Sequence, residues 1–337
     1  MSFTPLLAAL LCLLPVLCFL TTLVYLDSYK LVQPGLVAVV MGGGVAAALL
    51  AFVVNQALLE RLALDHAAYA RYVSPLIEEA LKASIIVWLI RRQRIGFLVD
   101  AAILGFAVGS GFALIENLYV LWHAPEAGWP TWVVRGFGTA IMHGGATAIV
   151  AVIGLAVTER DERRGLVAAL PGFVVAVLLH AAFNHLSHAP KAATLAVLLA
   201  VPPLLLLAFH RGEHTLADWL GRGFDADTQM LELIHSGRLS GSPVGHYLAS
   251  LKSRFRGPVV ADLLCYLGLF TELALRAKGV LMMRENGFEP TLDEATRAKF
   301  AEMRYLEQSI GRTGMLALQP LLPMRRKALS QIYTLAG

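Results

Sequence analysis

Charged residues are scarce in this sequence. Of its 337 residues, 15% are charged and 57% belong to the hydrophobic set, whereas a soluble globular chain carries about 25% charged and about 45–50% apolar residues. The composition excludes a disordered or collagen-like chain, argues against an ordinary cytosolic enzyme and favours a membrane protein. The formal net charge of +4 is small and spread along the chain, so the sequence does not indicate nucleic-acid binding.

Cysteine is also nearly absent. The three cysteines, Cys12, Cys18 and Cys265, form no CxxC pair. Two of them lie in the first apolar stretch and the third lies in the C-terminal part. The sequence therefore indicates neither a disulfide framework nor a thiolate zinc site.

The charges that are present are unevenly distributed. Residues 1–210 hold 12 Lys/Arg and 11 Asp/Glu, whereas the shorter stretch 211–337 holds 16 Lys/Arg and 13 Asp/Glu. We therefore expect two domains, a membrane-spanning bundle over 1–210 and a small helical cytoplasmic domain over 211–337, which has no long apolar run. The sequence assigns no role to the second domain. Its basic clusters can contact lipid headgroups or can simply form a solvated face; they are Lys252, Arg254 and Arg256, and Arg325, Arg326 and Lys327.

Several apolar segments are long enough to cross a membrane, which takes about 20 residues for about 30 Å of hydrocarbon. The predicted fold is all-α, a polytopic transmembrane helical bundle of about seven spans. The spans are roughly 5–26, 36–59, 71–90, 97–122, 131–157, 166–187 and 192–209.

The orientation follows from Lys and Arg in the short loops, which are enriched on the cytoplasmic side. One alternating set of loops holds seven such residues, including the clusters at 91–94 and 160–164, and the other set holds four. We therefore expect the N-terminus outside and the C-terminal domain in the cytoplasm.

Four successive predicted spans contain polar side chains that lipid does not tolerate without a partner or a role. They are Glu78, Glu79 and Lys82 in the third span, Glu116 in the fourth, His143 in the fifth, and His180 and Asn184 in the sixth. At a rise of 1.5 Å per residue, Glu78, His143, His180, Glu116 and Asn184 lie about 18–27 Å from the cytoplasmic helix ends. We expect one convergent site in the outer half of the bilayer.

Structural interpretations compete with this one for each residue alone. A Glu–Lys pair can be a neutralised bridge, and a single histidine can hold two helices together. The whole set at one depth favours a site. Carboxylates that face imidazoles suit the activation of water, and an amide or ammonium group can stabilise an oxyanion, so the set is compatible with an amide hydrolase.

Motifs of other intramembrane proteases are missing. The sequence contains no HExxH zinc helix and no GxGD motif. The stretch Gly109-Ser110-Gly111 follows Val108 and so lacks the first glycine of a rhomboid-type GxSG. We interpret Ser110 as a small packing residue.

The remaining set resembles the PrsW family of intramembrane proteases, distant relatives of the CAAX-processing endoproteases. The resemblance covers roughly residues 20–190. The matching elements are Glu78-Glu79-x-x-Lys82, Phe112-x-x-x-Glu116-Asn117, His143, His180-x-x-x-Asn184, and Tyr25-x-Asp27-x-Tyr29 after the first span.

The resemblance implies cleavage of a peptide bond of a membrane protein substrate, in or beside the bilayer, as in site-one cleavage of an anti-sigma factor. It also implies a location in the bacterial inner membrane. The roles that it implies are general base for Glu78, support of that base for Glu79 and Lys82, positioning of water or metal for His143 and Glu116, and oxyanion binding for His180 and Asn184.

The sequence leaves the cofactor open. Glu116, His143 and His180 offer the nitrogen and oxygen ligands of an open zinc site, and the same groups can serve a metal-free glutamate protease. The CAAX relatives have a histidine where this chain has Glu116, so the resemblance leaves open which of Glu116 and His143 plays the matching role.

Two functions of other classes also use buried charges. A proton-coupled transporter would do so, but its paired Gly/Pro interruptions in two related halves are not evident in the sequence. A non-catalytic membrane sensor or immunity protein of the same ancestry would tolerate substitution of the polar set.

Overall fold

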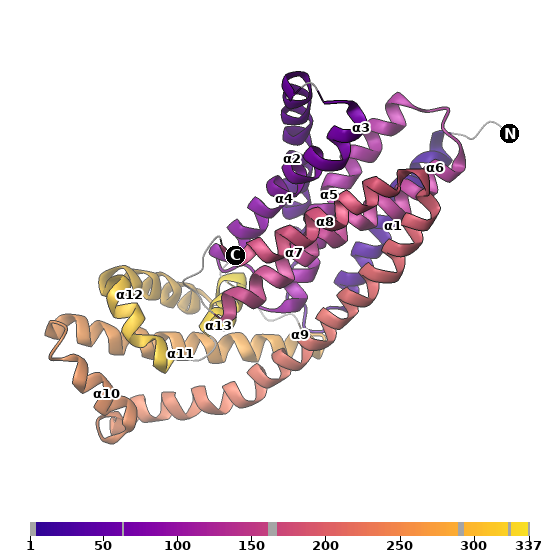
Figure 1. Ribbon diagram of the computed structural model, residues 1–337. Helices are drawn as coiled ribbons and strands as arrows, with labels where there is room; N and C mark the ends of the chain where they lie inside the picture. The colour runs from indigo at the N-terminus through magenta and orange to yellow at the C-terminus, as the bar shows by residue number, and fades with distance from the viewer. Residues whose placement is uncertain (1–4, 63, 161–166, 289–292, 323–324, 336–337) are drawn as a thin grey trace. The chain divides into compact units, whose positions relative to one another are not determined.

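The computed structural model describes residues 5–62, 64–160, 167–288, 293–322 and 325–335, and every regular element in these ranges is helical (Figure 1). The chain forms two compact units, Met1–Glu213 and His214–Gly337. The all-α fold predicted from the sequence is confirmed.

The first unit is a bundle of long helices interrupted by short turns. Its elements are α1 (Pro5–Leu26), α2 (Pro34–Leu62), α3 (His66–Ala68), the π-helical turn η1 (Tyr69–Val73), α4 (Ser74–Arg91), α5 (Leu98–His123), α6 (Trp129–Val133), the π-helical turn η2 (Val134–Thr139), α7 (Ala140–Arg160), α8 (Leu170–His185), the 3₁₀ turn η4 (Leu186–His188) and the first part of α9 (Pro190–His235).

Helix α5 lies at the centre of this bundle and packs against α1, α2 and α7. Small residues allow the helix backbones to approach closely. A Cβ atom on Gly109 would lie 2.2 Å from the carbonyl oxygen of His143, and one on Gly44 would lie 2.0 Å from that of Val108. Helices α5 and α7 therefore touch at the level of His143.

Seven helices of the described chain are long and apolar enough to cross a membrane. Six of them correspond to predicted spans. The predicted span 71–90 corresponds to η1 and α4. This segment is not among the seven apolar helices, because Glu78, Glu79 and Lys82 make it too polar. Yet α4 packs inside the bundle against α2, α7 and α8.

The seventh apolar helix is α11 (Gly257–Glu285) in the second unit. The expectation that residues 211–337 contain no long apolar run is therefore wrong. The charge count over the whole stretch was misleading, because Asp262 and Glu272 are the only charged residues between positions 257 and 275 of α11.

The second unit is built around α11. Its other elements are the end of α9, the 3₁₀ turn η5 (Arg238–Gly241), α10 (Pro243–Leu251), α12 (Glu294–Leu318), the 3₁₀ turn η6 (Gln319–Leu321) and α13 (Arg325–Leu335). Helix α11 packs against α12 and α13, and its buried residues Tyr266 and Phe270 stack with their ring centroids 6.1 Å apart.

Candidate active site

The innermost part of the site is an ion pair on α4. Lys82 Nζ lies 2.6 Å from Glu79 Oε1, and both side chains are 0% exposed. The two residues are three positions apart, so they share a helix face. Each charge compensates the other where neither could be solvated.

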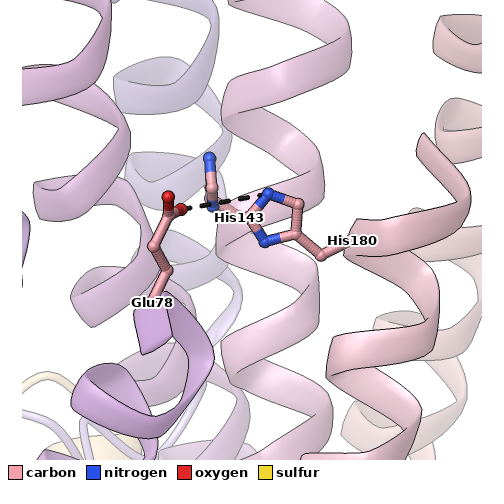
Figure 2. A group of neighbouring side chains, drawn as sticks. All are labelled: Glu78, His143 and His180. Carbon is pink, nitrogen blue, oxygen red and sulfur yellow. Dashed lines mark ion pairs between the residues drawn. The ribbon is translucent and has the colours of Figure 1, made fainter. Parts of the chain in front are cut away.

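Glu79 also fixes the orientation of His180 on α8. The imidazole Nδ1 lies 2.8 Å from Glu79 Oε1. Because a carboxylate only accepts hydrogen bonds, Nδ1 carries a proton and donates it to Glu79. The other ring nitrogen, Nε2, faces Glu78 Oε2 at 3.9 Å, the contact drawn in Figure 2.

A second chain of contacts runs through His143 on α7. Lys82 Nζ lies 2.9 Å from His143 Nδ1, and His143 Nε2 lies 2.7 Å from Glu116 Oε2 on α5. Since an ammonium group only donates, Nδ1 accepts from Lys82 and Nε2–H donates to Glu116. Glu116 Oε1 is paired with Arg135 in η2 at 2.8 Å, so the chain alternates donors and acceptors.

Glu78 is held from its other side. Its Oε1 accepts hydrogen bonds from the hydroxyl of Ser74 and from Asn55 Nδ2, the latter at 3.3 Å. Asn55, on α2, accepts in turn from the hydroxyl of Tyr69 at 2.9 Å. These contacts direct the free oxygen, Oε2, toward His180.

Sequence reasoning missed Asn55, Tyr69, Ser74 and Arg135. A signal existed for two of them: Asn55 is a polar residue within the second apolar span, and Ser74 precedes Glu78 by one helical turn. Nothing in a single sequence relates Tyr69 or Arg135 to this site.

Asn184 lies one turn after His180 on α8, and its Nδ2 donates to the carbonyl oxygen of Ala70 at 2.8 Å. The π-helical turn η1 explains why this carbonyl is available. Ser74 N–H bonds to Tyr69 O in the π-helical pattern, and the next donor in that pattern would be Pro75, which has no N–H. Asn184 thus ties α8 to the start of α4.

A cavity of about 410 Å³ connects these groups. Five of the seven predicted site residues line it, while Glu79 and Lys82 lie behind its wall. The five are Glu78, Glu116, His143, His180 and Asn184. Arg71 and Arg135 add positive charge to the wall. The structure therefore brings these five candidate residues to one cavity.

Glu78, His143 and His180 form a cluster that fits a metal ion. One ligand atom from each lies within 4.8 Å of the others (Figure 2). Two imidazole nitrogens and one carboxylate oxygen are a common ligand set of catalytic zinc. A carboxylate that orients a ligand histidine, as Glu79 orients His180, is the usual support of such sites.

This cluster differs from the predicted ligand set by one residue. Glu78 takes the place of Glu116, which lies beyond His143 and is engaged by Arg135. Glu116 as a metal ligand stays a prediction. His143, whose two nitrogens contact Lys82 and Glu116, would have to release one of these contacts to bind an ion.

Comparisons with known proteins agree with the geometry. A family model described as PrsW family intramembrane metalloprotease matches residues 33–208, which include every residue of the site. No curated protein and no solved structure matches the chain. The matched segment covers more than half of the sequence and ends before the second unit. The chain belongs to the PrsW family of intramembrane metalloproteases and is an integral membrane peptidase.

Proposed function

We propose that Glu78 activates the water molecule that hydrolyses a peptide bond of a membrane protein substrate. The observation that carries this proposal is the distance of 3.9 Å between Glu78 Oε2 and His180 Nε2. That gap lets one water molecule hydrogen-bond to both atoms. A general base must lie within such reach of the proton that it removes.

This arrangement supplies a donor or an acceptor for each proton transfer of the reaction. Water adds to the scissile carbonyl carbon while Glu78 takes its proton, and Glu78 then gives that proton to the leaving amine. Asn184 has a second N–H beside the one that Ala70 accepts, and we assign it to the carbonyl oxygen as negative charge develops there. Lys82 and Glu79 keep His143 and His180 in their tautomers.

A zinc ion is the alternative that the cluster of Glu78, His143 and His180 favours. When bound, the ion supplies a Lewis acid that polarises the scissile carbonyl. In that form Glu78 is occupied as a ligand and is not the base. The two forms differ in their response to a chelator, so they are distinguishable.

The substrate class follows from the family and the position of the site. We propose a single-pass membrane protein, such as an anti-sigma factor, cleaved near the outer face of a bacterial inner membrane. This assignment rests on the topology expected from the loop charges, with the N-terminus outside and the second unit in the cytoplasm.

Cleavage of a single-pass test substrate in proteoliposomes tests the proposal. We expect Glu78→Gln and His143→Ala to lower the cleavage rate by about 10²–10⁴, the range for loss of a general base. Glu126→Gln is the matched control, because Glu126 is exposed and outside the cavity. Full activity in both site variants would refute the assignment. Loss of activity with a chelator, restored by zinc, would select the metal-dependent form.

A further inference from the structure

The second unit contains a cavity of about 650 Å³ that lies outside the family match and shares no residue with the active site. The end of α9, η5, α10 and the first turns of α11 form it. Its walls are aliphatic, and their largest side chains are Ile234, Leu239, Leu248, Val260 and Leu264. Its volume is typical of small-molecule sites, which measure about 300–1,000 Å³.

The turn before α10 fixes one wall of this cavity. Ser242 Oγ accepts from Gly245 N–H at 3.1 Å and donates to Leu239 O at 2.7 Å. A Cβ atom on Gly245 would lie 1.9 Å from Leu239 O, so only glycine allows this approach. The capped N-terminus of α10 therefore holds this wall of the cavity in place.

The edge of the cavity is positively charged. Lys252 is the one charged residue among the lining residues that the structure describes, and none of them is acidic. Arg254 and Arg256 come two and four residues after it in the sequence, and all three side chains are exposed. An aliphatic interior with a cationic edge complements a molecule that has a hydrocarbon chain and an anionic head.

The cavity belongs to a chain that is embedded in a membrane. The chain is an integral membrane protein, so a unit attached to it experiences membrane lipids at a high effective concentration. Anionic lipids attract basic clusters that lie close to a membrane. We propose that the cavity binds an acyl chain of an anionic phospholipid, whose phosphate contacts Lys252.

Photochemical labelling of the full chain in phosphatidylcholine nanodiscs tests this proposal. The probes are phosphatidylglycerol and phosphatidylcholine, each with a diazirine at the end of one acyl chain. We expect phosphatidylglycerol to label peptides from residues 234–264 about fivefold more than phosphatidylcholine does, since one cationic residue near an anionic headgroup contributes about that factor.

Variants identify the cavity as the labelled site. Ala261→Phe places a large ring in the cavity, because Ala261 lines it and is exposed, and should abolish the labelling. Lys252→Glu should reduce phosphatidylglycerol labelling to the phosphatidylcholine level. Arg297→Glu is the matched charge control, because Arg297 is exposed on α12 and does not line the cavity. Ala249→Leu, at a lining position on α10, replaces Ala261→Phe if that variant does not fold.

Four results would overturn the proposal. Equal labelling by the two lipids would exclude headgroup selectivity, and labelling that survives filling of the cavity would place the lipid elsewhere. Labelling by a photoreactive fatty acid but not by phospholipid would assign the cavity to a free acid. Crosslinks between two copies of the chain at these peptides, in place of lipid, would make it a protein interface.

Discussion

At the scale of single residues, the orientation of Glu78 depends on a neighbouring helix. Ser74 and Asn55 hold Oε1, so the second oxygen points at His180. Asn55 is itself oriented by the hydroxyl of Tyr69. Because both oxygens of a free carboxylate are equivalent, these bonds decide which of the two is available for the proposed reaction.

Asn55 is accordingly a positioning residue. We predict that Asn55→Ala lowers kcat about tenfold with little change in KM, because a hydrogen bond to a charged group contributes about 1.5–3 kcal/mol. Tyr69→Phe should have a smaller effect in the same direction. Steady-state cleavage kinetics in proteoliposomes measure both.

The control for Asn55 is the next residue, Gln56, which is exposed and bonds to Glu60. Gln56→Ala should retain full activity. If Asn55→Ala raised KM and left kcat unchanged, Asn55 would contribute to substrate binding and not to the orientation of Glu78.

Sequence reasoning selected the polar residues that the structure brings together in the candidate site, but not those that orient them. Glu79 and Lys82 were predictable as a pair because three positions separate them on one helix. The bonds of Asn55 and Arg135 join different helices, and only the packing of those helices brings them together. Single-sequence periodicity contains no such distances.

At the scale of helices, close contact between α5 and α7 positions His143. We predict that Gly109→Ala forces these helices apart, because the new Cβ atom would lie 2.2 Å from His143 O. Overpacking of this kind costs about 1–3 kcal/mol, and a shift of about 1 Å at a reacting group can cost about 10² in rate. Thermal unfolding in detergent and the cleavage rate should both fall.

Gly42→Ala is the matched control, because a Cβ atom on Gly42 meets nothing within 4 Å. This substitution should stabilise α2 by about 0.5–1 kcal/mol, since alanine loses less backbone entropy in a helix than glycine does. Unchanged activity of Gly109→Ala would show that the position of His143 tolerates helix separation.

The loop between α1 and α2 is held by a buried acid, Asp27, whose Oδ2 accepts from Val32 N–H at 3.0 Å. Burial raises the pKa of Asp27 to about 6 from an ordinary value of 3.8. The folded chain therefore binds this proton more tightly than the unfolded chain does, and this group adds stability as the pH falls from above 6 toward 4.

We predict that the stability of the unmodified protein rises by about 2 kcal/mol relative to Asp27→Asn between pH 7 and pH 4. The amide keeps an acceptor for Val32 but does not titrate, so the comparison isolates Asp27 from other groups. Thermal unfolding of both proteins across this pH range provides the measurement. A constant difference between them would contradict a raised pKa.

At the scale of the whole molecule, composition described the first unit well and the second unit poorly. The apolar share of residues 1–210 indicated a membrane bundle, and the family match from 33 to 208 agrees. The charges of 211–337 concealed α11, which by length and composition alone could cross a membrane. An average over a segment cannot separate one apolar helix from its charged neighbours.

The candidate site belongs to one unit alone, because all seven predicted site residues lie in the first unit. In the second unit, Lys278 is buried, lies 2.6 Å from Asp227 and sits 4.8 Å above the ring of Trp219. We predict that Lys278→Met destabilises the second unit by about 3 kcal/mol, because it removes the partner of a partly buried carboxylate, and leaves peptide cleavage unchanged.

Amide hydrogen exchange, resolved by segment along the chain, measures this effect. We expect faster exchange in α11 and α12 and unchanged exchange in α4, α7 and α8. Arg222→Met is the matched control, since the Arg222–Asp218 pair is exposed on both sides and such pairs contribute about 0–1 kcal/mol. If cleavage instead falls in proportion to the loss of protection in α11, the second unit is required for catalysis, and the active site cannot be understood from the first unit alone.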